Sequence, residues 1–198
     1  RFLSRVYDRV NPFIWTADMR AAAIDLAAID AADCVLDVGC GTGYATEALL
    51  DEAADVHALD QSTHQLERAY AKFGKRGPVR FYRGDAERLP FADDTFDVVW
   101  SSGSIEYWPD PVATLTELRR VARPGGTVLV VGPNAPKWRV FRWIADAIML
   151  FYDEATADRM FHEAGFAEVD HRLLGPAYNP EIAIATRARV PTDEPASE

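Results

Sequence analysis

Lysine is scarce in this 198-residue sequence. It occurs only at Lys72, Lys75 and Lys137, and 31 acidic residues outnumber the 21 Lys and Arg residues, so the formal net charge is −10. Clustered positive charge is what binds nucleic acid and anionic lipid. The charge balance therefore argues against nucleic acid as a partner and against broad electrostatic adhesion to a membrane.

Cysteine is scarce too. The two cysteines, Cys34 and Cys40, cannot form a disulfide framework, and neither has the spacing of a metal-binding partner. We expect both to be packing residues in a reducing compartment, and we expect no metal. No signal peptide is visible, and no apolar run reaches the length of a membrane span. These absences favour a cytoplasmic protein.

Hydrophobic residues make up 48% of the sequence, which is enough for the core of one domain. Segments with the pattern of buried strands alternate with segments of helical period. This alternation predicts an α/β fold with a doubly wound, mostly parallel, seven-stranded sheet. The predicted strands are 34–38, 55–59, 79–82, 96–100, 127–131, 166–174 and 181–187. The predicted helices are 17–30, 42–52, 62–73, 110–122 and 153–164.

A glycine-rich turn, Asp37–Gly43 with the sequence DVGCGTG, follows the first predicted strand. In a sheet of this kind ligands bind at the carboxyl ends of the strands. Glycines let the backbone approach a ligand closely, and the N-terminus of the next helix offers free N–H groups. A dinucleotide-binding turn would have glycine where this chain has Tyr44, so the spacing disfavours an NAD-dependent reductase.

Two further acidic residues follow the next two strands. Asp60 ends the second predicted strand, one strand–helix–strand unit after Asp37, where a carboxylate can accept hydrogen bonds from both hydroxyls of a ribose. Asp85 comes directly after the third strand. Because the carboxyl ends of parallel strands meet at one edge of a sheet, the three acids predict a nucleoside-binding site there.

The glycine turn, the Asp85 loop and the turn Arg119–Gly126 resemble those of class I S-adenosylmethionine-dependent methyltransferases. This resemblance implies the Rossmann-like fold of that class and S-adenosylmethionine as the cofactor. It also implies that Asp85 accepts from the adenine amino group and that Ala86 contacts the ring through its backbone. The residues expected to bind the cofactor are Tyr7, Asp37, Gly39, Cys40, Gly41, Gly43, Asp60, Gln61, Asp85, Ala86 and Ser101.

The octapeptide Ser104–Pro111 is similar to one subfamily, the plant plastid methyltransferases that act on prenylated and phytylated benzoquinols. The resemblance extends over most of the chain, from Arg1 to Pro176. It implies that the chain, as a prokaryotic relative, C-methylates the ring of a prenylated quinol in quinone biosynthesis. A menaquinone-type naphthoquinol is an equally open substrate. A small-molecule O- or N-methyltransferase and a non-catalytic cofactor-binding subunit remain the alternatives.

This interpretation divides the chain by role. Residues 1–189 form one methyltransferase domain and residues 190–198 a disordered tail. Within the domain, we expect an N-terminal helical cap (1–30), a cofactor-binding core (31–132), and a part with the substrate-side helices and the last strands (133–189).

Glu106, Tyr107 and His162 are the candidate catalytic residues. Glu106 and Tyr107 follow the fourth strand, near the expected position of the methyl group, and Glu106 could accept the proton of a quinol hydroxyl. It could equally pair with an arginine or cap the helix that begins near Asp110. His162 lies on a late helix that could face the pocket, which makes it a second candidate base.

The segment 137–151 is rich in Trp, Phe, Ile and Met, with Arg and Asp interspersed. It predicts an amphipathic helix inserted before the last strands. Such a helix could form the wall of a channel for a lipid tail, lie on a membrane surface or simply cover the sheet. The resemblance implies a lipophilic quinol as the partner, and a helix of this kind would allow a peripheral contact with the membrane.

Overall fold

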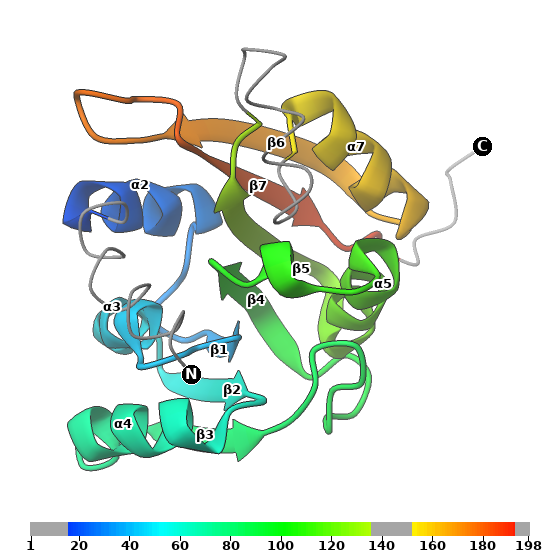
Figure 1. Ribbon diagram of the computed structural model, residues 1–198. Coiled ribbons are helices and arrows are strands. Elements are labelled where there is room, and N and C mark those ends of the chain that lie inside the picture. The colour runs from blue at the N-terminus through cyan, green and yellow to red at the C-terminus, as the bar shows by residue number, and fades with distance from the viewer. Residues whose placement is uncertain (1–15, 136–151, 193–198) are drawn as a thin grey trace.

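The computed structural model describes residues 16–135 and 152–192. Within them lies a seven-stranded sheet in the order β3-β2-β1-β4-β5-β7-β6 (Figure 1). β7 pairs antiparallel with both β5 and β6, and the other pairs are parallel. The strands are β1 (Cys34–Val38), β2 (Asp55–Asp60), β3 (Val79–Arg83), β4 (Phe96–Ser102), β5 (Ala122–Pro133), β6 (Ala167–Leu174) and β7 (Ala183–Arg189). The predicted doubly wound, mostly parallel sheet is thus confirmed.

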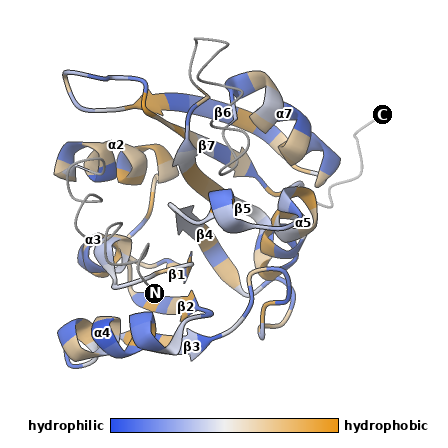
Figure 2. Cartoon of the chain, in the orientation of Figure 1, coloured by the Kyte–Doolittle hydropathy of each residue, from blue (hydrophilic) through white to orange (hydrophobic). Residues whose placement is uncertain are grey.

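Helices cover both faces of the sheet. The described helices are α2 (Ala17–Ala27), α3 (Tyr44–Glu52), α4 (Thr63–Phe73), α5 (Pro111–Val121), α7 (Glu154–Glu163) and the 3₁₀ turn η1 (Ile105–Tyr107). Buried residues of α2 and α3 pack on one face together with Val35 of β1, whereas those of α5 and α7 pack on the other together with Leu36. Neighbouring residues of a strand therefore belong to separate cores, because successive side chains of a strand point to opposite faces of the sheet. Figure 2 shows hydrophobic residues gathered in the central strands and hydrophilic ones along α4.

Side-chain caps fix where several helices begin. The Ser62 hydroxyl accepts a hydrogen bond from the N–H of Gln65 and thereby caps α4. Asp110 caps α5 by accepting from the N–H of Ala113 at 3.0 Å, and Pro111 stands in the first turn. Ser62 thus starts α4 directly after the end of β2, whereas Asp110 starts α5 after the turn η1 that follows β4.

The turn predicted at residues 124–126 persists as an irregularity of β5, because Gly125 has a φ of +74° and the pairing register with β4 shifts between Ala122 and Thr127. What differs from the prediction is that β5 begins at Ala122 instead of residue 127. The cause is a long-range backbone pairing. The N–H of Gly125 donates to the carbonyl of Val190, and the N–H of Val190 donates to the carbonyl of Gly126. Val190 is buried at 7% exposure. Val190, where the tail was predicted to begin, is therefore paired with β5 in the described part of the chain.

Three predictions fall on residues that the structure does not describe. These are the cofactor contact of Tyr7, most of the N-terminal cap and the apolar helix at 137–151 with its membrane contact. They stay predictions. Among the described helices, none is long and apolar enough to cross a bilayer.

Candidate functional site

The glycine turn between β1 and α3 is folded back onto β2. The N–H groups of Gly39 and Cys40 both donate to the carbonyl of Leu59, at 2.8 and 3.0 Å. Gly39, Gly41 and Gly43 all have positive φ, a conformation that favours glycine. Each predicted glycine is therefore required by the path of the backbone.

The space beside each glycine shows which one faces a ligand. A Cβ at Gly39 would lie 2.6 Å from the Ser104 Cβ, and one at Gly43 would lie 2.5 Å from the Phe73 ring. A Cβ at Gly41 would have nothing within 4 Å. Gly39 and Gly43 are thus closed in by packing, whereas Gly41 faces open space at the carboxyl edge of the sheet. The N-terminus of α3 begins beside it, and the free N–H groups of a helix N-terminus favour an anionic group.

Asp60 connects this turn to the end of β2. Its Oδ2 accepts from the N–H of Gly41 at 2.9 Å, and its Oδ1 accepts from the N–H of Ser62 at 2.8 Å. Each carboxylate oxygen has further acceptor capacity, so the same group can also receive ribose hydroxyls. Gln61, next along the chain, is exposed, and its carbonyl accepts from Arg83.

Asp37 is buried beneath the turn at 1% exposure. The Thr46 hydroxyl, in the first turn of α3, donates to Asp37 Oδ2 at 2.6 Å. Burial, helped by the nearby charge of Asp60, raises the pKa of Asp37 to about 7 despite this hydrogen bond. Cys40 is also buried here, and desolvation raises its thiol pKa well above the ordinary value. Asp37 thus acts as a support for the turn.

The Asp37→Asn variant should be more stable than the wild type at pH 8. Below an unfolded pKa near 3.8 the carboxyl is protonated in both states and carries no penalty. As pH rises towards about 7 the unfolded chain ionises first, so the wild type loses stability, by at most about 4 kcal/mol. Asparagine can still accept from Thr46 and never ionises.

Urea unfolding of both proteins at pH 4, 6 and 8 measures this effect. The difference in unfolding free energy should be small at pH 4 and should grow towards pH 8. A variant that is less stable than the wild type at pH 8 would contradict the buried, desolvated position of Asp37.

The loop after β3 lies at the same edge. Asp85 is exposed, and its Oδ1 accepts from the N–H of Glu87 at 3.1 Å. Ala86 is half-buried and packs against the core. The structure therefore brings Asp60, Asp85 and the glycine turn to neighbouring positions, since β1, β2 and β3 are adjacent and parallel.

The segment after β4 packs directly on the glycine turn. Ser101 is fully buried, and its hydroxyl lies 2.6 Å from that of Ser104. Ser104 in turn fills the space over Gly39. Sequence reasoning did not identify Ser104 or Thr46 as individual contributors. Ser104 is one residue of the octapeptide Ser104–Pro111, which indicates a subfamily without indicating a role for each residue. Thr46 has no feature in the sequence that distinguishes it from other residues of its helix.

Glu106, in η1, is largely buried, and its Oε2 has no hydrogen-bond partner among the described residues. Desolvation raises the pKa of this carboxyl to about 7, partly offset by the backbone N–H of Glu106 itself. The alternative role as a helix cap does not apply, because Asp110 caps α5. A carboxyl with such a pKa can take up a proton near neutral pH.

The other two catalytic candidates, Tyr107 and His162, do not share the buried position of Glu106. Tyr107 is 55% exposed, and Trp108 is buried in the core. His162 is exposed on the last turn of α7, where its ring contacts the carbonyl of Phe166. The following Gly165 lies against Arg119, at the end of α5, where β5 begins. The structure therefore places His162 away from the glycine turn, at the amino end of β5.

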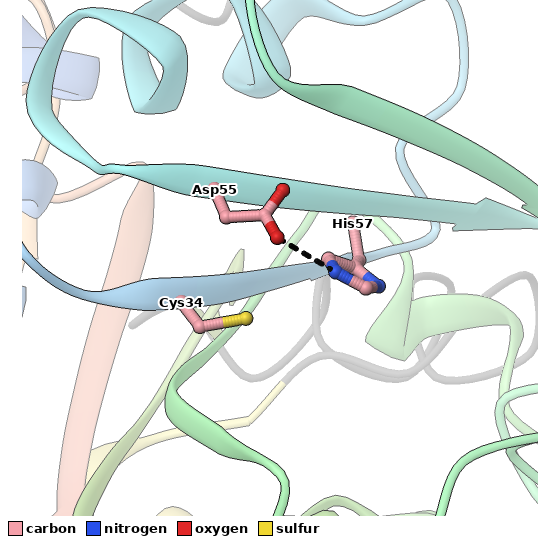
Figure 3. Close-up of side chains that lie close together, drawn as sticks. All are labelled: Cys34, Asp55 and His57. Carbon is pink, nitrogen blue, oxygen red and sulfur yellow. Dashed lines mark hydrogen bonds and ion pairs between the residues drawn. The ribbon is translucent and has the colours of Figure 1, made fainter.

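Cys34, Asp55 and His57 form a group that sequence spacing did not reveal, because they come from adjacent strands (Figure 3). One potential ligand atom from each lies within 4.8 Å of the others. They lie in the amino-terminal halves of β1 and β2, whereas the glycine turn follows the carboxyl end of β1. Arg80 pairs with Asp55 and its Nη1 lies 2.9 Å from His57 Nε2. Because this guanidinium already supplies the positive charge, we interpret the group as packing between strands.

Sheet order and site together define a doubly wound protein with a ligand site built from a glycine turn and acids at the ends of β1, β2 and β3. The family described as "Methyltransferase domain" matches residues 36–130. A 2-methyl-6-phytyl-1,4-hydroquinone methyltransferase of Oryza sativa is 45% identical over 182 residues, which cover 90% of this chain and 52% of that enzyme. The chain thus spans about half the length of that relative.

A demethylmenaquinone methyltransferase of Beutenbergia cavernae is 31% identical, over 78% of this chain and 74% of that enzyme. The solved structure of an S-adenosylmethionine-dependent methyltransferase from Mesorhizobium loti superposes with a TM-score of 0.68 at 21% identity, covering 86% of this chain and 97% of that one. This chain belongs to the S-adenosylmethionine-dependent methyltransferase family, in the branch that includes quinol methyltransferases.

Proposed function

We propose that the protein transfers a methyl group from S-adenosylmethionine to a ring carbon of a prenylated quinol. The observation that supports this best is the position of Glu106. Its buried carboxyl sits on a turn whose Ser104 packs on Gly39 of the glycine turn. A proton acceptor thus lies beside the predicted cofactor site, and the relatives are named as methyltransferases of 2-methyl-6-phytyl-1,4-hydroquinone and of demethylmenaquinone.

The described residues fit the cofactor. We propose that Asp60 receives the ribose hydroxyls, that Asp85 and the Ala86 backbone receive the adenine, and that the open side of Gly41 and the N-terminus of α3 receive the methionine part. When bound, S-adenosylmethionine supplies an electrophilic methyl group. The chain's contribution is to fix the acceptor carbon in line with it, and such positioning can be worth about 7–11 kcal/mol of barrier.

Glu106 makes the acceptor carbon more nucleophilic. A phenolic hydroxyl has a pKa of about 10 in water, so little phenolate exists at neutral pH. A carboxylate that takes the hydroxyl proton pushes electron density onto the adjacent ring carbon. Its raised pKa, about 7, brings it closer to that of the hydroxyl and makes the transfer less unfavourable.

We expect the reduced quinol to be methylated and the oxidised quinone to be inert. An electrophilic methyl group needs an electron-rich carbon, and a quinone ring is electron-poor and carries no hydroxyl proton for Glu106 to accept. Incubation with radiolabelled S-adenosylmethionine and a prenylated benzoquinol, kept reduced with dithionite or fully oxidised, measures both rates. Faster methylation of the oxidised form would exclude carbon methylation by this mechanism, and label on oxygen would favour the O-methyltransferase alternative.

A further inference from the structure

Two buried polar atoms at the carboxyl edge of β4 and β5 have no hydrogen-bond partner among the described residues. One is Oε2 of Glu106, and the other is the hydroxyl oxygen of Tyr152. Tyr152 has no exposed surface. Most buried polar groups are paired, so two unpaired ones near each other indicate that a ligand group completes them.

The backbone holds Tyr152 at this edge. Its N–H donates to the carbonyl of Pro133 at 3.4 Å, and its carbonyl accepts from the N–H of Ala135 at 3.2 Å. The next residue, Asp153, caps α7. Tyr152 is therefore fixed between the end of β5 and the start of α7.

Gly132 brings Tyr152 and η1 together. A Cβ at this position would collide with the side chain of Ile105 and would lie 2.9 Å from the Tyr152 hydroxyl. Ile105 is the residue before Glu106, so the tyrosine hydroxyl and the turn that carries the carboxyl both pack over Gly132. The charge of Glu106 acts on Tyr152 as well.

We propose that the Tyr152 hydroxyl and the Glu106 carboxyl bind one ring hydroxyl of the acceptor from two sides, Tyr152 donating to its oxygen and Glu106 accepting its proton. This inference rests on the proposed function and adds a residue that recognises the substrate. It predicts that the site selects a phenolic oxygen next to the carbon that is methylated.

The step balances as follows. The new C–C bond forms between the methyl group and the ring carbon adjacent to the hydroxyl, while the S–C bond breaks and its electron pair stays on sulfur. The hydroxyl proton passes to Glu106, and the oxygen becomes the carbonyl of a dienone to which Tyr152 donates. Loss of the proton on the methylated carbon and return of a proton from Glu106 to the oxygen restore the quinol. One proton is released overall.

Tyr152 keeps its own proton throughout. Burial, and then the nearby Glu106 charge, raise the pKa of its hydroxyl far above the ordinary value. It is therefore a hydrogen-bond donor at any working pH. The bond strengthens as negative charge develops on the substrate oxygen, so Tyr152 should affect kcat more than KM.

The Tyr152→Phe variant tests the proposal, because it removes one oxygen and keeps the ring that packs over Gly132. We expect kcat to fall roughly 10- to 100-fold, as for loss of a charge-assisted hydrogen bond, with KM little changed. Tyr82→Phe is the matched control, since the Tyr82 ring packs against His57 and Phe91, on the far side of β1 from β5. A Tyr152→Phe enzyme with the kcat of the wild type overturns the proposal.

A double variant with Tyr152→Phe and Glu106→Gln shows whether the two side chains act on the same substrate hydroxyl or contribute to the rate independently. If both side chains act on one substrate oxygen, the double variant should be only slightly slower than Glu106→Gln alone. Losses that multiply in full would mean that the two residues act at separate places and would overturn the two-sided site.

Binding of 4-nitrophenol, followed by its absorbance, gives a readout that does not require turnover. At pH 8 this probe is mostly the phenolate, whose oxygen carries the negative charge that a quinol acquires only during the reaction, so we expect Tyr152→Phe to bind it about three- to tenfold more weakly than the wild type. Tyrosine-dependent binding without methylation of any quinol would support the hydroxyl site and remove the quinol function. Quinol methylation with equal 4-nitrophenol binding by both proteins would keep the function and overturn the hydroxyl site.

Discussion

Replacing Glu106 by Gln should lower kcat by about 10²- to 10⁴-fold and leave S-adenosylmethionine affinity unchanged. The amide keeps the shape of the side chain but cannot take the quinol proton. Cofactor affinity should be preserved because the proposed cofactor contacts come from the glycine turn, Asp60 and Asp85. Turnover of a reduced prenylated quinol and calorimetric titration of the cofactor measure the two quantities separately.

The pH dependence identifies the base more directly. In the wild type, kcat should rise with pH through about 7 as Glu106 loses its proton, and this rise should be absent in Glu106→Gln. Asp37 has a raised pKa in the same range, so the comparison of the two proteins is needed to assign the rise. Glu163→Gln, at an exposed carboxylate of α7, is the control. Full turnover by Glu106→Gln would show that a water or another side chain is the base.

Replacing Asp60 should weaken cofactor binding by at least about tenfold, since each charge-assisted hydrogen bond to the ribose is worth about 1.5–3 kcal/mol and about 1.4 kcal/mol corresponds to a factor of ten. Asp60→Ala also removes the acceptor that holds the N–H of Gly41. Asp60→Asn separates these contributions only in part. The oxygen of the asparagine side chain can still accept from the N–H of Ser62. Its NH₂ group is a donor, however, and would be placed against the N–H of Gly41, which is also a donor.

Calorimetric titration with S-adenosylmethionine, beside the exposed control Asp51→Ala of α3, measures this loss. Both Asp60 variants should bind weakly and the control should bind like the wild type. Unchanged affinity in Asp60→Ala would remove Asp60 from the cofactor site and leave it a purely structural anchor of the turn.

Most of the fold could be predicted because its signals are local. Short apolar runs such as Cys34–Val38 alternate with amphipathic segments, and caps such as Ser62 mark where helices begin. The start of β5 could not be predicted. Pro124, Gly125 and Gly126 favour a turn by local preference, and Gly125 keeps a φ of +74°, but pairing with Val190, which is distant in sequence, makes the segment part of the strand.

The candidate site divides in the same way. Glycines and acids at the ends of successive strands could be recognised, because parallel topology alone brings them to one edge. The roles of Tyr152 and Thr46 depend on which atoms pack together, which no spacing reveals. For His162 the sequence predicts the helix but not the end of the helix that faces the site. The start of α7 lies at the carboxyl edge of the sheet, whereas His162 is on its last turn.

The position of β7 affects how the chain can fold during synthesis. β7 is made last among the strands, yet it lies inside the sheet, between β5 and β6. While residues 183–189 are still within the ribosome, β5 exposes an unpaired edge, and β6 has no strand to join. Such edges invite pairing with other chains. A stalled or truncated product lacking this strand would carry the whole glycine turn and still be at risk of aggregation, so a complete cofactor motif would not mark a complete fold.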